Sequence, residues 1–233
     1  MRLLSVNGNK RFFLSRYHKN VLKWLEEVDP DVVTVQEPWV NKPARWWKLQ
    51  NYHLVGASDD VLVWSKPHVT AAVLQVADHR VAFKANGFEI HAVHLDPYKG
   101  TTRRNQLKDL QEGGGNNGKP MVVVGDFNLA PRPQDGRFGN AHSTATGADE
   151  RRAFDDFLGT FQLVDATRVE GVEPEFTFER KYEGQWFRGR CDLALLPSAL
   201  EPDQARAVYD HEVRTGPGAF TDHSAIVVDL PDW

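Results

Sequence analysis

The stretch at residues 121–128, Met-Val-Val-Val-Gly-Asp-Phe-Asn, decides the fold of this chain. An apolar run that leads into glycine predicts a buried strand, which then presents a carboxylate and a carboxamide two residues apart. If the chain stays extended, Asp126 and Asn128 lie on the same side of the strand end. The carboxylate can then accept a proton from water, and the amide can orient that water or a phosphate oxygen. The alternative is an Asx turn that closes the strand, and these residues alone do not decide between the two.

Short β-branched or aliphatic runs recur along the whole chain and predict further strands, at residues 3–6, 31–35, 61–64, 69–76, 89–94, 193–196 and 225–230. Several of these runs are apolar at nearly every position, which is typical of strands covered on both faces. Amphipathic stretches predict helices from an N-cap at Ser15 to about Val28, at 101–111 and at 149–158. Residues 113–118 and 132–147 are expected to form loops. We therefore expect a single domain, residues 1–233, of α+β class, with two packed sheets and helices outside.

The composition narrows the function classes. A net charge of −4 argues against a generally cationic nucleic-acid coat protein, but it permits an enzyme whose positive surface faces the phosphates. Cys191 is the only cysteine, so an intramolecular disulfide and a cysteine-rich zinc site are excluded. No apolar run approaches the roughly 20 residues of a membrane span, and the first residues lack the apolar core of a signal peptide. The sequence predicts a soluble cytoplasmic protein, expected to be a monomer without a membrane partner.

Polar side chains also follow other predicted strands. Glu37 ends an apolar run and is a plausible ligand for hard cations such as Mg²⁺ or Mn²⁺. Asp192 opens another run, where a carboxylate can orient a histidine and stabilise its cationic form. The remaining strand ends carry amides, a histidine and an Asp-His pair, at Asn7, Asn9, His94, Asp222 and His223. Taken singly, each group is explained as a solvated strand end or a surface ion pair, but together they predict one site where the sheet ends.

Five of these segments resemble, in order and type, the endonuclease/exonuclease/phosphatase superfamily, which includes exonuclease III, deoxyribonuclease I and the LINE retrotransposon endonucleases. The matching pieces span almost the whole chain and are Ser-Val-Asn-Gly-Asn (5–9), Val-Gln-Glu (35–37), Val-Gly-Asp-Phe-Asn (124–128), Arg-Cys-Asp (190–192) and Thr-Asp-His-Ser-Ala-Ile (221–226). The resemblance implies a four-layer α/β/β/α sandwich, in which two face-to-face β-sheets are flanked by helices.

The resemblance also implies metal ligands. Glu37 is similar to the main metal ligand of the superfamily, with Asn9 beside it, and Asp222 is similar to a residue near a second metal position. The implied cofactor is Mg²⁺ or Mn²⁺. Such a cation suits the chemistry, because a phosphodiester repels anionic nucleophiles until its oxygens are neutralised.

Catalytic roles follow from the same resemblance. Asp126 is similar to the group that activates the attacking water, helped by Asn128. His223 is similar to the imidazole that contacts the scissile phosphate, with Asp192 hydrogen-bonded behind it. Asn7 is similar to a residue that supports this centre.

The substrate is less clearly indicated. The segments at 150–152, 163–165 and 176–178 resemble the matching stretch of exonuclease III, which favours the DNA-repair branch. His94, however, stands where exonuclease III-like and LINE enzymes carry tyrosine, and in this it resembles deoxyribonuclease I and several phosphatases. A histidine there can donate a proton to the leaving oxygen. The pocket that accepts an abasic sugar in repair enzymes is only partly matched, chiefly by Phe178.

Loop residues that mix positive charge with aromatic surface are candidates for contacts with phosphates and bases. The main candidates are Arg103, Arg104, Phe178, Trp186 and Arg188, with Arg132, Arg137, Arg151, Arg152 and Phe187 as further ones, whereas Trp39, Trp46 and Trp47 are equally explained by packing. The sequence thus predicts a Mg²⁺-dependent phosphodiester hydrolase whose partner is nucleic acid, with a DNA endo- or exonuclease favoured. The alternatives are a phosphatase or phosphodiesterase acting on a phosphoinositide, sphingolipid or nucleotide, and a binding protein that has lost its chemistry.

Overall fold

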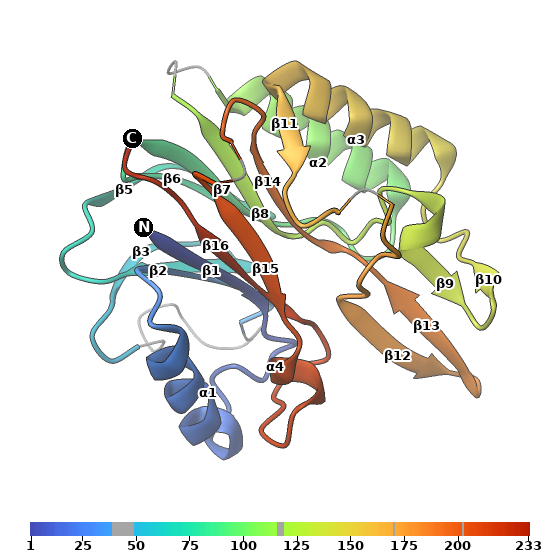
Figure 1. The fold of residues 1–233 in the computed structure, drawn as a ribbon, viewed down its shortest axis with the longest axis horizontal. Coiled ribbons are helices and arrows are strands. Elements are labelled where there is room, and N and C mark those ends of the chain that lie inside the picture. Colours follow the sequence, from blue (N-terminus) through green and yellow to red (C-terminus); the bar gives the residue numbers. More distant parts are fainter. Residues whose placement is uncertain (39–48, 116–118, 170, 202) are drawn as a thin grey trace.

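Two large β-sheets packed face to face form the centre of the molecule (Figure 1). The computed structural model describes residues 1–38, 49–115, 119–169, 171–201 and 203–233, so Trp39, Trp46 and Trp47 lie outside the described residues. In the described part of the chain, no helix has the length and apolarity that a membrane span requires.

Each large sheet has six strands, named here in their order across the sheet. The first contains β15 (Arg206–Asp210), β16 (Ala225–Asp229), β1 (Arg2–Asn7), β2 (Val32–Gln36), β4 (Val61–Ser65) and β3 (His53–Ala57). The second contains β11 (Leu163–Asp165), β14 (Asp192–Pro197), β8 (Met121–Asp126), β7 (Phe88–His94), β6 (Arg80–Ala85) and β5 (Ala71–Ala77). Both sheets are mixed, because β1 pairs with β2 and β7 pairs with β8 in parallel while the other pairs are antiparallel.

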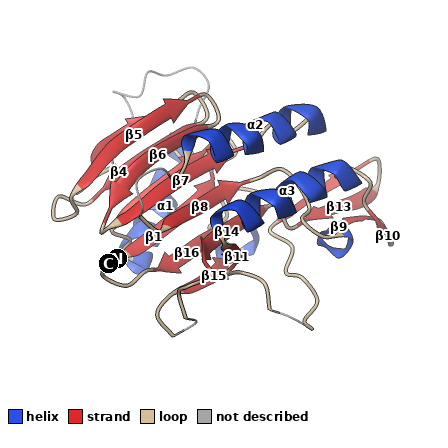
Figure 2. Ribbon diagram, turned by 90° about the horizontal axis from the view of Figure 1, so that it is seen from above, coloured by secondary structure: helices blue, strands red, loops and turns tan. Residues whose placement is uncertain are grey.

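Helices cover the outer faces of both sheets and complete four layers (Figure 2). On the first sheet, α1 (Ser15–Val28) buries Val21, Trp24 and Leu25, and the short α4 (Glu212–Thr215) contributes Val213 to the same cluster. On the second sheet, α2 (Gly100–Gly113) and α3 (Ala148–Phe161) bury an aliphatic and aromatic layer that includes Leu107, Leu110, Phe154 and Phe157. Between the sheets lies a third cluster, largely of valine, isoleucine, leucine and phenylalanine. The predicted four-layer sandwich is therefore confirmed.

A third, smaller sheet projects from one end of the sandwich, at the right in Figure 1. It contains, in order, β10 (Ala141–His142), β9 (Gly136–Phe138), β13 (Gln185–Gly189) and β12 (Phe178–Tyr182), and we call it the minor sheet. The expectation that residues 132–147 form only a loop was wrong, because β9 and β10 fall within them together with a 3-10 turn at Pro133–Asp135. These strands are too short to leave a clear alternating pattern in the sequence.

One further expectation was wrong, and one predicted strand has a position that the sequence did not indicate. Ser15 is the first helical residue of α1, and the N-cap position belongs to Leu14, which makes no side-chain capping hydrogen bond. The apolar run at 69–76 forms β5, but as an edge strand, so Val73, Leu74 and Val76 are exposed. Apolar composition alone did not distinguish an edge strand from a central one.

Candidate active site

Three side chains of the predicted site lie next to one another because of strand register. His94 at the end of β7 is paired with Asp126 at the end of β8, and Asp126 is paired with Asp192 at the start of β14. On the facing sheet, Asn7 at the end of β1 is paired with Gln36 at the end of β2. Both sheets therefore deliver polar side chains to the same end of the sandwich.

The corner at residues 125–128 depends on its glycine. Gly125 has φ +142°, and a Cβ there would lie 2.1 Å from the Val93 carbonyl oxygen on β7. The two strands approach so closely that only glycine fits. The sharp turn that follows presents the Asp126 carboxylate at the edge of the sheet, where it is nonetheless only 1% exposed.

The Asx turn and the functional interpretation of Asp126 are compatible. Its Oδ1 accepts a hydrogen bond from the Asn128 backbone N–H at 2.8 Å, which closes the turn, while its Oδ2 accepts from Asn7 Nδ2 at 2.9 Å. The chain does not stay extended from Asp126 to Asn128, because Asn128 has φ 49° and its amide donates to the Leu95 carbonyl at 2.9 Å. The turn therefore occupies one carboxylate oxygen and leaves the other directed toward the opposite sheet.

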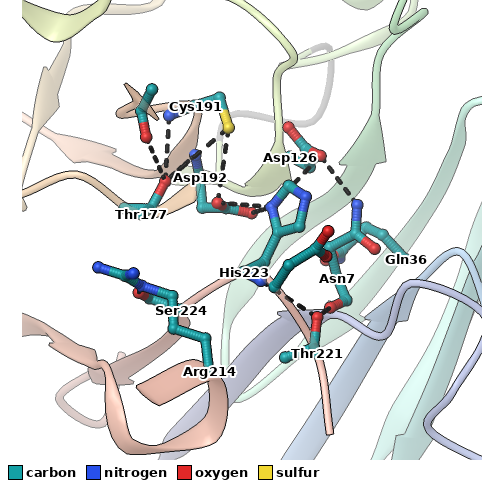
Figure 3. A network of polar contacts seen from close by, with 12 residues as sticks. Asn7, Gln36, Asp126, Thr177, Cys191, Asp192, Arg214, Thr221, His223 and Ser224 are labelled. Carbon is teal, nitrogen blue, oxygen red and sulfur yellow. Dashed lines mark hydrogen bonds and ion pairs between the residues drawn. The ribbon is translucent and has the colours of Figure 1, made fainter. Parts of the chain in front are cut away.

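His223 lies between two buried carboxylates (Figure 3). Its Nδ1 is 3.0 Å from Asp192 Oδ2 and 3.8 Å from Asp126 Oδ2. Burial alone lowers the pKa of His223, but the charges of Asp192 and then Asp126 outweigh it and raise the pKa to about 10. Burial also raises the pKa of Asp126, and the nearby Asp192 charge adds to that rise. The cluster thus holds a charged imidazole at neutral pH beside a carboxylate that accepts protons more readily than usual.

Hydrogen bonds to two threonines fix this cluster (Figure 3). Thr177 Oγ1 accepts from the backbone N–H groups of Cys191 and Asp192, both at 3.1 Å. Thr221 Oγ1 donates to the Asn7 carbonyl at 2.6 Å and accepts from the His223 N–H at 3.2 Å. The loop that carries His223 is therefore attached to the ends of strands from both large sheets.

Glu37 and His94 extend the cluster in the other direction. Asn7 Nδ2 lies 3.3 Å from Glu37 Oε1, and His94 Nε2 lies 3.5 Å from that same oxygen. Asp60, in the turn between β3 and β4, lies 3.8 Å from His94 Nδ1. Burial lowers the pKa of His94, but Asp60, Asp126 and Glu37 together raise it above its ordinary value. Within the described residues neither ring nitrogen makes a hydrogen bond, and each is instead held at ion-pair distance from a carboxylate.

Further oxygen donors suited to a hard cation lie on Asn9 and Asp222, which are joined to the cluster through Asn7. Asn9 Nδ2 donates to Asp222 Oδ1 at 2.6 Å, and the Asn9 backbone N–H donates to Asn7 Oδ1 at 2.9 Å. Asn9 and Glu37 both have left-handed backbones, with φ 42° and 43°, a conformation that non-glycine residues rarely adopt outside functional sites and tight turns. The Glu37 side chain is 24% exposed, and its Oε2 lies 3.9 Å from the Lys10 ammonium nitrogen. The Glu37 carboxylate and the Asn9 amide oxygen are of the type that could hold a divalent cation.

A second group of potential ligands, Asp126, Cys191 and His223, has donor atoms within 4.8 Å of one another. It suits a metal less well, because burial and then the Asp126 and Asp192 charges raise the pKa of the Cys191 thiol well above its ordinary value. A protonated thiol is a poor ligand, and His223 is held as a cation. The oxygen donors of Glu37 and Asn9 are the better candidates for the metal.

The sequence matches the model of the endonuclease/exonuclease/phosphatase family over residues 6–223, which include every side chain of this cluster. The chain belongs to the endonuclease/exonuclease/phosphatase family. Members of the family are hydrolytic nucleases and phosphatases, generally dependent on divalent metals, and this chain is a hydrolase of that class. No curated protein sequence matches it.

Solved structures agree with the family fold over the full length of the chain. An AP endonuclease from Archaeoglobus fulgidus has a TM-score of 0.74 at 20% identity, covering 99% of each chain. A 3'-5' exonuclease from Neisseria meningitidis has a TM-score of 0.72 at 20% identity, covering 100% of each. A 3' phosphatase from Neisseria, bound to a product DNA hairpin, has a TM-score of 0.74 at 20% identity with the same coverage. At this identity the likeness establishes the fold alone.

The residues predicted to contact the substrate do not lie together in the structure. Phe178 lies at the cluster, with its ring centroid 4.7 Å from that of His223. Arg104 is on the surface of α2, where it pairs with Asp149 at 3.5 Å. Trp186 and Arg188 are half-exposed on β13, and cross-strand pairing places them on the face of the minor sheet opposite to Phe178.

Arg103 does not fit a substrate-binding role. It is 4% exposed, its Nε donates to Glu150 Oε1 at 2.7 Å and its Nη1 donates to the Asp96 carbonyl at 2.8 Å. This buried ion pair joins α2 to α3, so the guanidinium has no free edge for a phosphate. The sequence suggested otherwise because Arg103 and Arg104 are adjacent, and a helix directs adjacent residues to different faces.

Two residues at the site were missed by sequence reasoning. Asp60 is the last residue of the turn after β3. Because β3 was not predicted, Asp60 was not identified as a residue near the end of a strand. Arg214 donates to Ser224 Oγ at 2.7 Å, to Glu179 Oε2 at 2.6 Å and to the Phe176 carbonyl at 2.9 Å. Arg214 thus ties the residue after His223 to the minor sheet, through contacts between segments that are distant in the sequence.

Proposed function

We propose that this hydrolase is a Mg²⁺- or Mn²⁺-dependent nuclease that cleaves DNA phosphodiester bonds, endo- or exonucleolytically. One observation carries the proposal: contacts run without interruption from Asp192 through His223, Asp126 and Asn7 to Glu37. Such a row provides a cationic group, a proton acceptor and a metal-binding carboxylate within one cluster, as hydrolysis of a phosphodiester requires.

Asp126 is the proposed general base. Its Oδ2 is oriented by Asn7, and its raised pKa makes it a better proton acceptor than an ordinary aspartate. As the water oxygen forms a bond to phosphorus, the water proton passes to Asp126 and the bond from phosphorus to the leaving oxygen breaks. His223, held charged by Asp192, stabilises the negative charge on the phosphate oxygens. His94 is the proposed donor of a proton to the leaving oxygen.

Glu37 and Asn9 are the proposed metal ligands. A bound Mg²⁺ or Mn²⁺ would neutralise phosphate charge and orient the scissile group. Asp222 accepts a hydrogen bond from the Asn9 amide nitrogen, which leaves the amide oxygen available to a cation. We therefore assign Asp222 the task of orienting Asn9.

DNA is favoured over a small ester by charge. The strands of the minor sheet carry Arg137, Arg180, Lys181 and Arg188 against one carboxylate, Glu179, in a chain whose net charge is −4. A local excess of cations next to a hydrolytic centre is typical of a surface that contacts nucleic-acid phosphates. The relatives whose names mention DNA or nuclease activity agree with this choice. His94 keeps a small phosphate ester as the second candidate.

The proposal is tested with purified protein and Mg²⁺ on supercoiled plasmid, abasic duplex, single-stranded DNA, RNA and a phosphoinositide panel. We expect turnover of at least one DNA substrate, abolished by EDTA and restored by excess Mg²⁺. Intact DNA at high enzyme concentration, together with turnover of a phosphoinositide, would overturn the nuclease assignment. Undiminished turnover after exhaustive chelation would overturn the metal assignment.

A further inference from the structure

One face of the minor sheet carries a row of aromatic side chains. In β12, Phe178 and Tyr182 point to the same face, because side chains alternate along a strand. Phe187 on β13 is paired with Arg180 of β12, so it shares that face, and Phe138 on β9 is paired with Phe187. The rings of Phe178 and Phe187 are in edge-to-face contact, with centroids 6.1 Å apart. Three adjacent strands therefore place Phe178, Phe187 and Phe138 next to one another across the sheet, in that order.

This aromatic row begins at the catalytic cluster. The Phe178 ring lies against the His223 ring at 4.7 Å between centroids, and the two residues also form a backbone bridge. From His223 the row crosses the strands of the minor sheet in the order β12, β13 and β9, and this sheet projects from one end of the sandwich (Figure 1). A substrate strand that leaves the cluster on this side passes over the row.

The row is not explained as core packing. Its three phenylalanines belong to none of the three apolar clusters that the described residues form. Phe138 is 38% exposed, and Tyr182, on the same face, is 60% exposed. Aromatic side chains gathered on an open surface, rather than scattered singly, mark a binding surface.

Charge on the same face indicates the occupant. Arg180 lies between Phe178 and Tyr182 in β12, opposite Phe187, and it is exposed. No ion pair of Arg180 is found among the described residues. A free guanidinium beside a row of aromatic rings combines the two features that single-stranded nucleic acid requires, a cation for the backbone and faces on which bases stack.

We propose that this face binds unpaired nucleotides of the DNA strand adjacent to the scissile phosphate, with bases stacking on Phe187 and Phe138 and a phosphate contacting Arg180. The inference rests on the proposed nuclease function and specifies its substrate. Bases within a duplex already stack on one another and hide their faces, so the exposed ring of Phe138 and the partly exposed ring of Phe187 gain stacking contact only from bases that are unpaired. The preferred substrate is therefore DNA with a single-stranded tail or gap next to the cleavage site.

The test compares a blunt duplex with duplexes that carry an unpaired tail of several nucleotides at the 3' or the 5' end. Bis(4-nitrophenyl) phosphate serves as a small diester that does not extend beyond the cluster. We expect the native protein to have a lower KM for one of the tailed duplexes than for the blunt one. Phe138→Ala and Phe187→Ala should each raise the KM for that tailed duplex by roughly tenfold, the range expected from the loss of one stacked base. Phe138→Ala should leave the hydrolysis of the small diester unchanged, because the ring contacts of Phe178 within the described residues are with Phe187 and His223 and not with Phe138.

Three further variants make the test specific. Phe138→Leu retains apolar bulk without an aromatic face, so it should behave like Phe138→Ala while preserving the fold. Trp233→Ala removes an exposed aromatic that packs on Phe88, outside the minor sheet, and should leave the preference for the tail unchanged. Trp186→Ala removes a ring from the opposite face of the minor sheet. If Trp186→Ala abolishes the preference for the tailed duplex and Phe138→Ala does not, the assigned face is wrong.

Failure of the inference and failure of the proposed function give different results. A protein that hydrolyses neither the small diester nor any DNA lacks the proposed function. A protein that hydrolyses both, but treats blunt and tailed duplexes alike in native and Phe138→Ala forms, overturns this inference alone.

Discussion

Asp126 and Asp192 are direct cross-strand partners on β8 and β14, and the His223 imidazole contacts both carboxylates, at 3.8 Å and 3.0 Å. Two carboxylates so placed would repel each other if both were ionised without a cation between them. The imidazolium of His223 offsets that repulsion, and the carboxylates in turn keep it protonated. The protonation states of His223 and Asp126 are therefore linked, and the pH dependence of activity should reveal the linkage.

We expect a broad pH profile with a high alkaline limit. The raised pKa of His223, about 10, keeps the imidazole charged below that pH, so activity that needs the charge falls as pH rises through about 10. Asp192→Asn removes the carboxylate whose charge raises the pKa of His223 more than the charge of Asp126 does. The alkaline limit of activity should therefore move to lower pH by roughly one to three units. The measurement is kcat/KM against pH for both proteins, with Asp229→Asn as a control. An unchanged alkaline limit in Asp192→Asn would show that His223 is not the group that titrates.

Asp126→Asn should lower kcat by roughly 10²- to 10⁴-fold, the usual contribution of a general base, with little change in KM. The variant should also be less stable by about 1 to 3 kcal/mol, because an amide nitrogen cannot accept the hydrogen bond that one Asp126 oxygen accepts from Asn7 or from the Asn128 backbone. Steady-state kinetics measure the effect on kcat, and thermal denaturation measures the effect on stability. Full activity in a folded variant would exclude Asp126 as the base.

Glu37→Gln should weaken activation by metal. Loss of one anionic oxygen donor should raise the Mg²⁺ concentration for half-maximal activity by about tenfold or more. Direct titration with Mn²⁺, followed by calorimetry, separates metal binding from catalysis. Glu27→Gln, on an exposed position of α1, is the matched control. Equal Mn²⁺ affinity in Glu37→Gln and the native protein would place the metal elsewhere.

Gly125→Ala should destabilise the protein by about 3 kcal/mol, because the added Cβ meets the Val93 carbonyl at 2.1 Å and the backbone φ of +142° is strained for alanine. Gly159→Ala, in α3, is the control: nothing lies within 4 Å of the added Cβ, and alanine is the better helix former. That variant should be stabilised by up to about 1 kcal/mol. Urea denaturation of both variants gives the comparison. A Gly125→Ala protein as stable as the native one would contradict the close approach of β7 and β8.

The sequence by itself determined the layered fold, the family and the types of residue at the strand ends. Apolar runs that end in Asp126, Glu37 or His94 are local patterns, and a strand that is buried along its length leaves a continuous apolar signal. The order of the polar segments along the chain was sufficient to indicate hydrolysis of a phosphate ester.

Only the tertiary structure decided which polar groups meet. The row of His94, Asp126 and Asp192 depends on the register of three strands, and register is set by packing between distant segments. The same holds for the burial of Arg103, for the approach of Asp60 to His94 and for the face on which the minor sheet gathers its aromatic rings. Each depends on contacts between residues far apart in the chain, which composition and periodicity do not record.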